Sequence, residues 1–164
     1  MNITFIGMPG SGKSTIGEWV ARETGMQFID VDKVIIEKTG MTLAEIIARD
    51  GNDGFRAVEN RINAELDVDN AVLAPGGSVI YGKEAMERLR EISTVVYLKI
   101  DREALEKRLG DLKARGVSMA PGQTFADLYN ERCPLYEKYA HVVIDTNGRT
   151  MAEVVHLVRK ACGV

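Results

Sequence analysis

A glycine-rich segment between a strand-like and a helix-like stretch constrains this chain most strongly. Residues 7–15 read GMPGSGKST and fit the pattern G-x-x-x-x-G-K-[ST], which ends here in Lys13 and Ser14. The apolar residues 2–6 (NITFI) predict a buried strand, and residues 14–24 predict a helix. A strand, a tight loop and a helix in this order are typical of a phosphate-binding P-loop.

Each part of this loop contributes to holding a phosphate. Glycines let successive backbone N–H groups curl round the anion, and the positive end of the following helix points at it. The ammonium of Lys13 can reach the β and γ oxygens of a nucleotide, and the hydroxyl of Ser14 can ligate Mg²⁺. The nucleotide-binding residues expected from the loop are Gly10, Ser11, Gly12, Lys13, Ser14 and Thr15.

Strand-like and helical segments alternate along the rest of the chain. Further strands are predicted at 27–30, 71–74, 94–100 and 141–144. Helices are predicted after Thr42 (a TLAE capping box) and at 54–66, 83–91, 101–109 (capped by Asp101), 124–139 and 150–161. This alternation predicts parallel strands with helical crossovers in a three-layer α/β/α fold. The 164 residues suit one domain, with the polar, glycine-bearing residues 110–123 as a mobile loop.

Composition excludes several classes of protein. A net charge of −3 argues against a nucleic-acid or polybasic membrane binder, and no apolar run approaches the roughly 18 residues of a membrane span. Cys133 and Cys162 are far apart, and no leader-like segment precedes the first strand, so we expect reduced thiols in a cytoplasmic protein. The chain has no Asn-Lys-x-Asp guanine-reading motif and no Walker B strand ending in Asp. A small-molecule kinase is what remains.

Two further patterns suggest an acceptor site. Asp30 and Asp32 follow the second predicted strand, where one carboxylate could hold Mg²⁺ and the other accept a hydroxyl proton. The alternative is that one of them only caps the next helix. Arg56 and Glu59 are three apart on a helix and can pair, fixing the arginine for carboxylate recognition. A surface ion pair is the alternative there, and Arg132 on the late helix could equally be a surface residue.

The ordered set of motifs resembles the shikimate kinase family. The motifs are GMPGSGKST, DVD, GFRAVE, PGGS, RCPLY and DTNGR, and they run from Gly7 to Arg149. The resemblance implies a nucleoside-monophosphate-kinase-like fold with a five-stranded parallel sheet and a lid at about 110–123. It also implies phosphorylation of the 3-hydroxyl of shikimate by ATP with Mg²⁺.

The resemblance assigns roles residue by residue. Asp32 would bind the shikimate hydroxyls and act as the candidate base, while Asp30 would lie near Mg²⁺ with Ser14. Arg56 and Arg132 would clamp the shikimate carboxylate, and Glu59 would hold Arg56. Further roles fall to the backbone of Gly76 and Gly77 (substrate contacts), to Arg115 (a lid arginine reaching the phosphates) and to Arg108 and Arg149 (the adenine site).

Departures from the family pattern leave related substrates open. The third glycine of the family is Ser78 here, the loop reads ARGVSMAPGQT, and Met151 stands near where the family often has a proline. The alternatives are a kinase on another small hydroxylated acid, such as gluconate, or on a nucleoside monophosphate. A non-catalytic nucleotide-sensing module is the alternative from a different class. The expected partner is a small molecule, and we expect a monomer.

Overall fold

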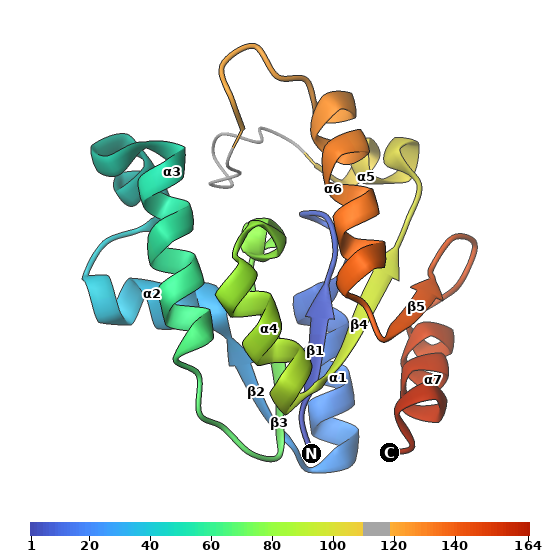
Figure 1. Ribbon diagram of the computed structural model, residues 1–164. Helices are drawn as coiled ribbons and strands as arrows, with labels where there is room; N and C mark the ends of the chain where they lie inside the picture. Colours follow the sequence, from blue (N-terminus) through green and yellow to red (C-terminus); the bar gives the residue numbers. More distant parts are fainter. Residues whose placement is uncertain (110–118) are drawn as a thin grey trace.

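A five-stranded parallel sheet forms the centre of the computed structural model, which describes residues 1–109 and 119–164 (Figure 1). The strands lie in the order β2-β3-β1-β4-β5, and every neighbouring pair is parallel. They are β1 (Ile3–Ile6), β2 (Gln27–Asp30), β3 (Ala71–Ala74), β4 (Thr94–Lys99) and β5 (Val142–Asp145). The predicted five-stranded parallel sheet is confirmed.

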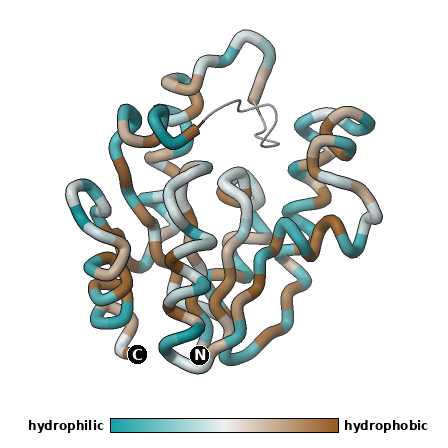
Figure 2. Tube along the Cα trace, turned by 180° about the vertical axis from the view of Figure 1, so that it is seen from behind, coloured by the Kyte–Doolittle hydropathy of each residue, from teal (hydrophilic) through white to brown (hydrophobic). Residues whose placement is uncertain are grey.

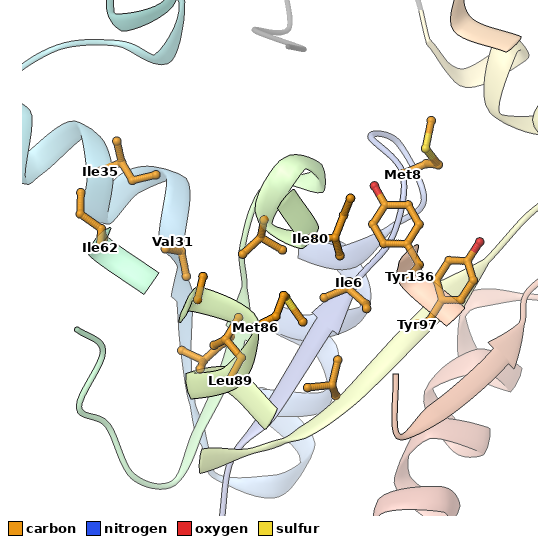
Figure 3. Close-up of a cluster of buried hydrophobic side chains, with 14 of the residues drawn as sticks. Ile6, Met8, Val31, Ile35, Ile62, Ile80, Met86, Leu89, Tyr97 and Tyr136 are labelled. Atoms are coloured by element: carbon orange, nitrogen blue, oxygen red, sulfur yellow. The ribbon is translucent and has the colours of Figure 1, made fainter. Parts of the chain in front are cut away.

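Helices cover both faces of this sheet. They are α1 (Lys13–Thr24), α2 (Val31–Thr39), α3 (Leu43–Ala64), the 3₁₀ helix η1 (Gly77–Tyr81), α4 (Lys83–Ile92), α5 (Arg102–Arg108), α6 (Phe125–Tyr139) and α7 (Met151–Cys162). One buried cluster joins the sheet to α1 and α7. The other joins it to α2, α3, α4, α5 and α6, and Figure 3 shows part of this second cluster around Ile6, Met86 and Tyr136. The α/β/α layering predicted from the alternation is therefore confirmed.

Burial on both faces explains the composition of the central strands. All four residues of β1 (ITFI) and all four of β3 (AVLA) are buried. Parallel strands covered on both sides are near-continuous apolar runs, because no face of the sheet meets water. In Figure 2, hydrophobic residues are drawn in brown, and brown segments gather in the middle of the molecule.

Helix α3 contains a kink that the sequence indicates. The predicted capping box is present, with the Thr42 hydroxyl accepting from the N–H of Glu45 at 3.1 Å. Gly51 then leaves the helical region, with φ of 74° and ψ of 178°, and helical geometry resumes after it. Next to this kink, the Asn52 side chain donates to the carbonyl of Met119 at 2.7 Å. The kink thus lies against the segment that leads into α6.

The structure corrects two local expectations. Asp101 occupies the N-cap position of α5, but its side chain makes no capping hydrogen bond there. Its Oδ1 instead accepts from Asn147 Nδ2 at 3.2 Å, which ties α5 to the loop after β5. The sequence after residues 71–74 predicts a turn at Pro75-Gly76-Gly77, and the structure continues this turn into η1. Of the expected lid at 110–123, residues 110–118 lie outside the described residues.

No helix within residues 1–109 and 119–164 has both the length and the apolar character required to cross a membrane. The feature that organises the rest of the molecule is the edge of the sheet where β1, β2 and β3 end, because ligands of parallel α/β sheets bind at the carboxyl ends of the strands.

Candidate active site

A cavity of about 170 Å³ lies at the carboxyl ends of β1, β2 and β3. It gathers residues from the glycine-rich loop, the D-x-D pair, α3, the segment after β3 and α6. The polar residues that line it are Lys13, Ser14, Asp30, Asp32, Glu59, Ser78 and Arg132, together with the backbone of Gly76 and Gly77. Five segments far apart in the sequence are thereby combined into one small polar site.

The glycine-rich loop has the geometry of an anion cradle. Gly12 adopts a φ of 98°, which favours glycine, and provides no side-chain cap to α1. The first N–H groups of α1 therefore face the loop without a capping side chain, as a bound phosphate requires. Lys13 Nζ donates to the carbonyls of Gly7 and Met8, both at 2.9 Å. Burial lowers the pKa of Lys13 to about 8, and the attraction of Asp32 opposes this shift.

Asp30 and Asp32 both line the cavity. Asp30 ends β2 and caps α2, since its Oδ1 accepts from the N–H of Asp32 at 3.0 Å. Asp30 therefore caps α2, as the alternative expected, and it lines the cavity as well. Asp32 lies in the first turn of α2, and its Oδ1 is buried with no hydrogen-bond partner among the described residues. Burial and the nearby charge of Asp30 raise the pKa of Asp32 to about 6, although the attraction of Lys13 opposes both effects.

Glu59 is held by Ser78. The Ser78 hydroxyl donates to Glu59 Oε1 at 2.5 Å, and both side chains are buried. Glu59 Oε2 and Asp32 Oδ1 approach Gly76 so closely that a Cβ there would lie 3.0 Å and 2.9 Å from them. Gly76 therefore lets two carboxylates converge beside the backbone. Burial raises the pKa of Glu59 to about 8, while the Ser78 hydrogen bond opposes the shift.

The two predicted arginines lie beside the same tyrosine. Arg132, on α6, is 1 % exposed, so it is not the surface residue of the alternative reading. The Cζ of Arg56 lies 3.9 Å from the ring centroid of Tyr81, and that of Arg132 lies 5.5 Å from it. In the described part of the chain Arg56 forms no ion pair with Glu59, contrary to expectation. The Ser78 hydroxyl engages Glu59, and the guanidinium of Arg56 covers Tyr81 instead.

Four further expected residues, Arg108, Arg149, Thr15 and Ser11, do not line the cavity. Arg108 Nη1 donates to the carbonyl of Gly10 at 3.2 Å, which places α5 against the glycine-rich loop. Arg149 is exposed beyond β5 and donates to the carbonyl of Asp145 at 3.1 Å. Thr15 is exposed on α1, while Ser11 is buried in the loop. Arg115 lies outside the described residues.

Sequence reasoning missed two tyrosines of the site. Tyr81 contacts both arginines, and the hydroxyl of Tyr136 donates to the carbonyl of Gly77 at 2.7 Å. Tyr136 lies four residues after Arg132 on α6, so both side chains lie on one helical face. This spacing is a sequence signal from which Tyr136 could have been predicted. No comparable signal marks Tyr81, because its position depends on η1.

Comparisons with known proteins agree with this geometry. The family model described as shikimate kinase matches residues 9–162. The shikimate kinase of Mycobacterium avium is 38 % identical over 157 residues, which cover 94 % of this chain and 89 % of the relative. That of Thermodesulfovibrio yellowstonii is 35 % identical over 162 residues, covering 97 % and 93 %.

Solved structures extend the agreement to the fold. The shikimate kinase of Acinetobacter baumannii in complex with shikimate superposes with a TM-score of 0.86 at 32 % identity, covering 98 % of this chain and 91 % of that one. A gluconokinase of Sinorhizobium meliloti, with a TM-score of 0.55 at 21 % identity over 99 % of this chain and 89 % of that one, shares the fold alone. Because the family model spans nearly the whole chain and the relatives match most of both lengths, this chain belongs to the shikimate kinase family.

Proposed function

We propose that this protein transfers the γ-phosphoryl group of ATP to the 3-hydroxyl of shikimate, giving shikimate 3-phosphate and ADP. One observation carries the proposal. A single cavity is lined by the loop lysine Lys13, the carboxylate of Asp32 and the buried guanidinium of Arg132. These are the groups required for a phosphoryl donor, an acceptor hydroxyl and an acceptor carboxylate. The related kinase of A. baumannii was solved with shikimate bound.

The donor side is assigned to the glycine-rich loop. Gly10, Ser11, Gly12, Ser14 and Thr15 surround the phosphates with backbone N–H groups and hydroxyls, and Lys13 contacts the β and γ oxygens. The bonds of Lys13 to two loop carbonyls support this role, because the same ammonium can exchange them for phosphate oxygens. Arg108, which already contacts Gly10, and Arg149 are assigned to the adenine side.

Ser14 and Asp30 are the residues that would hold Mg²⁺. Ser14 and Asp30 line the cavity together, and a hydroxyl and a carboxylate are ligands that Mg²⁺ prefers alongside phosphate oxygens. The ion, when bound, neutralises charge on the transferred phosphoryl group. Asp30 can serve here while it caps α2, since a carboxylate has lone pairs for both contacts.

Asp32 is assigned to the acceptor hydroxyl. Asp32 lines the same cavity as Lys13, and its buried Oδ1 has no partner among the described residues, so its carboxylate can accept a hydrogen bond from the 3-hydroxyl. A loose phosphoryl-transfer transition state needs little help from a base. Positioning the hydroxyl in line with the phosphoryl group is therefore its main work, and accepting the proton follows.

The carboxylate of the acceptor is assigned to Arg56 and Arg132. Guanidinium groups recognise carboxylates with paired N–H donors, and two of them here come from different helices. Gly76 and Gly77 contribute backbone contacts to the acceptor, and Glu59 lies behind Gly76. Arg115 is assigned to the phosphates as a lid residue. We also propose that the chain acts in the cytoplasm as a monomer with a single domain.

The test is ADP release by the purified protein with MgATP, measured with shikimate, gluconate, homoserine or nucleoside monophosphates as acceptor. We expect strong release with shikimate and background release with the others. Release with a different acceptor alone would replace shikimate but keep the phosphoryl-transfer site. Binding of ATP without release for any acceptor would favour the nucleotide-sensing module.

A further inference from the structure

The 3₁₀ helix η1 presents two side chains to α3. Ser78 and Tyr81 are three residues apart on η1, and side chains at this spacing eclipse one another on a 3₁₀ helix. The Ser78 hydroxyl holds Glu59, and the Tyr81 ring lies against Arg56. One short element therefore contacts both members of the α3 pair, which do not bind each other.

Tyr81 also contacts α6. The Cζ of Arg132 lies 5.5 Å from the ring centroid, within the roughly 6 Å of a cation–π contact, and that of Arg56 lies 3.9 Å from the same centroid. The hydroxyl of Tyr81 donates to the carboxylate of Glu131, the residue before Arg132. The same side chain thus touches α3 through its ring and α6 through its ring and its hydroxyl.

Two guanidinium groups so close together repel each other, and one anion between them would relieve the repulsion. The face of an aromatic ring is electrostatically negative, so a ring beside both cations lowers the cost of bringing them together. The ring also restricts the rotamers that Arg56 can adopt. Among the described residues Glu59 forms no ion pair with Arg56, since its Oε1 accepts from Ser78, and the buried Nε of Arg56 has no hydrogen-bond partner there.

We propose that Tyr81 is the positioning residue that fixes Arg56 and Arg132 for the carboxylate of the acceptor. This inference rests on the proposed function and extends it to selectivity for acids. Tyr81 itself need not touch the substrate. It sets the separation of the two guanidinium groups, and through them the preference for an acceptor with a carboxylate over a neutral polyol.

The experiment compares wild type, Tyr81→Leu and Tyr81→Phe in steady-state kinetics. Tyr81→Leu removes the ring but keeps apolar volume, and we expect the KM for shikimate to rise about tenfold while kcat and the KM for ATP change less than about twofold. Tyr81→Phe keeps the ring and should restore the KM to within about threefold of wild type. The methyl ester of shikimate, which lacks the charge, provides the readout of selectivity. Its kcat/KM should be nearly the same in all three proteins.

Tyr139→Leu is the matched control, because Tyr139 also has a cation–π contact, with Lys138 at 5.1 Å, at the far end of α6. It should leave the KM for shikimate unchanged.

An equal loss of kcat/KM for shikimate and for its methyl ester in Tyr81→Leu would overturn the inference, since that pattern reports a distorted cavity. So would an unchanged KM for shikimate. A wild-type protein inactive on shikimate would remove the proposed function itself. If Tyr81→Leu does not fold, Tyr81→Met is tested in its place with the same expectations.

Discussion

Three ionisable groups of the cavity have pKa values that burial moves toward neutrality. The pKa values of Asp32 and Glu59 are raised to about 6 and about 8, and that of Lys13 is lowered to about 8. Burial disfavours the charged form of each group, so the acids gain protons more readily and the lysine loses its proton more readily. Small changes of pH near neutrality therefore alter the charge of this site.

Asp32 should set the acidic limb of the activity profile. Its carboxylate must be ionised to accept from the acceptor hydroxyl, so we expect kcat/KM for shikimate to fall as pH drops below about 6. Asp32→Asn should remove this limb and lower kcat by about 10²–10⁴-fold, with the melting temperature maintained. A pH series of initial rates measures both effects.

Asp67→Asn is the control, because the side chain of Asp67 is 98 % exposed. It should leave the rate and the acidic limb unchanged. An Asp32→Asn protein that keeps the limb near pH 6 would show that another group sets it.

Glu59 should lower the stability of the folded protein at alkaline pH. Its folded pKa of about 8 lies above the ordinary value of 4.5, so the stability that protonation provides is present below about pH 4.5 and lost as pH rises through about 8. Glu59→Gln cannot ionise and can still accept from Ser78. We expect its melting temperature to match wild type at about pH 5 and to exceed it by about 2–4 °C at about pH 9, for a gain of ~1 kcal/mol.

Calorimetry at the two pH values provides the measurement. If the difference in melting temperature between Glu59→Gln and wild type is the same at the two pH values, Glu59 does not titrate between them. The pKa assignment would then be wrong.

The site residues that the sequence predicted are those with local motif signals. Lys13 and Ser14 follow from the loop pattern, and Arg132 was expected to bind substrate because RCPLY completes the family set. The structure gathers all three around the cavity. The bonds between Ser78 and Glu59, and between Tyr81 and the arginines, join segments about 20 residues or more apart. No spacing rule connects such segments, because their meeting depends on how α3 and η1 pack.

At the scale of secondary-structure elements, α1 approaches the sheet closely through Gly17. A Cβ at Gly17 would lie 2.7 Å from Cε1 of Phe28 and 3.4 Å from Cγ1 of Val72. Glycine inside a helix costs about 1 kcal/mol relative to alanine, whereas overpacking a core costs about 1–3 kcal/mol. Because α1 lies so close to β2 and β3, the steric cost of a Cβ at position 17 exceeds the gain in helix propensity that alanine would bring.

We expect Gly17→Ala to destabilise the protein by about 1–2 kcal/mol, since the clash with the Phe28 ring outweighs the gain in helix propensity. Urea unfolding measures the change. Glu18→Ala, at the next and exposed position, should change stability by less than about 0.5 kcal/mol. A Gly17→Ala protein more stable than wild type would mean that Phe28 moves aside freely.

Helices and strands could be predicted from the sequence where burial or capping determined which residues occur in them. The apolar runs of β1 and β3 identified strands because the sheet is covered on both faces, and Thr42 identified the start of α3 through its capping box. The helix η1 was not predictable, because a single 3₁₀ turn leaves no hydrophobic period. The failure of Asp101 to cap α5 has a similar cause, since its partner Asn147 follows β5.

At the scale of the whole molecule, two buried clusters share one sheet. Trp19, the one tryptophan of the chain, packs against the cluster of α1 and α7. Tyr97 and Tyr136 stack in the other cluster, with centroids 5.2 Å apart. The strands belong to both clusters, so loss of one cluster exposes the other.

We therefore expect one cooperative unfolding transition. Trp19 fluorescence, the near-ultraviolet circular dichroism of the tyrosines and the far-ultraviolet signal should give the same midpoint in urea. Separate midpoints for the tryptophan and the tyrosines would mean that the two layers unfold independently, and the single-domain proposal would then fail.

The strand order also determines when the phosphate-binding loop can be assembled. Ile3 pairs with Val72 on one side and with Thr94 on the other, so the first strand of the chain lies in the middle of the sheet. Pairing between distant segments is slow, and an apolar strand without neighbours is prone to aggregate. Among the five strands β1 is synthesised earliest, yet it cannot be flanked on both sides until β4, ending at Lys99, has left the ribosome.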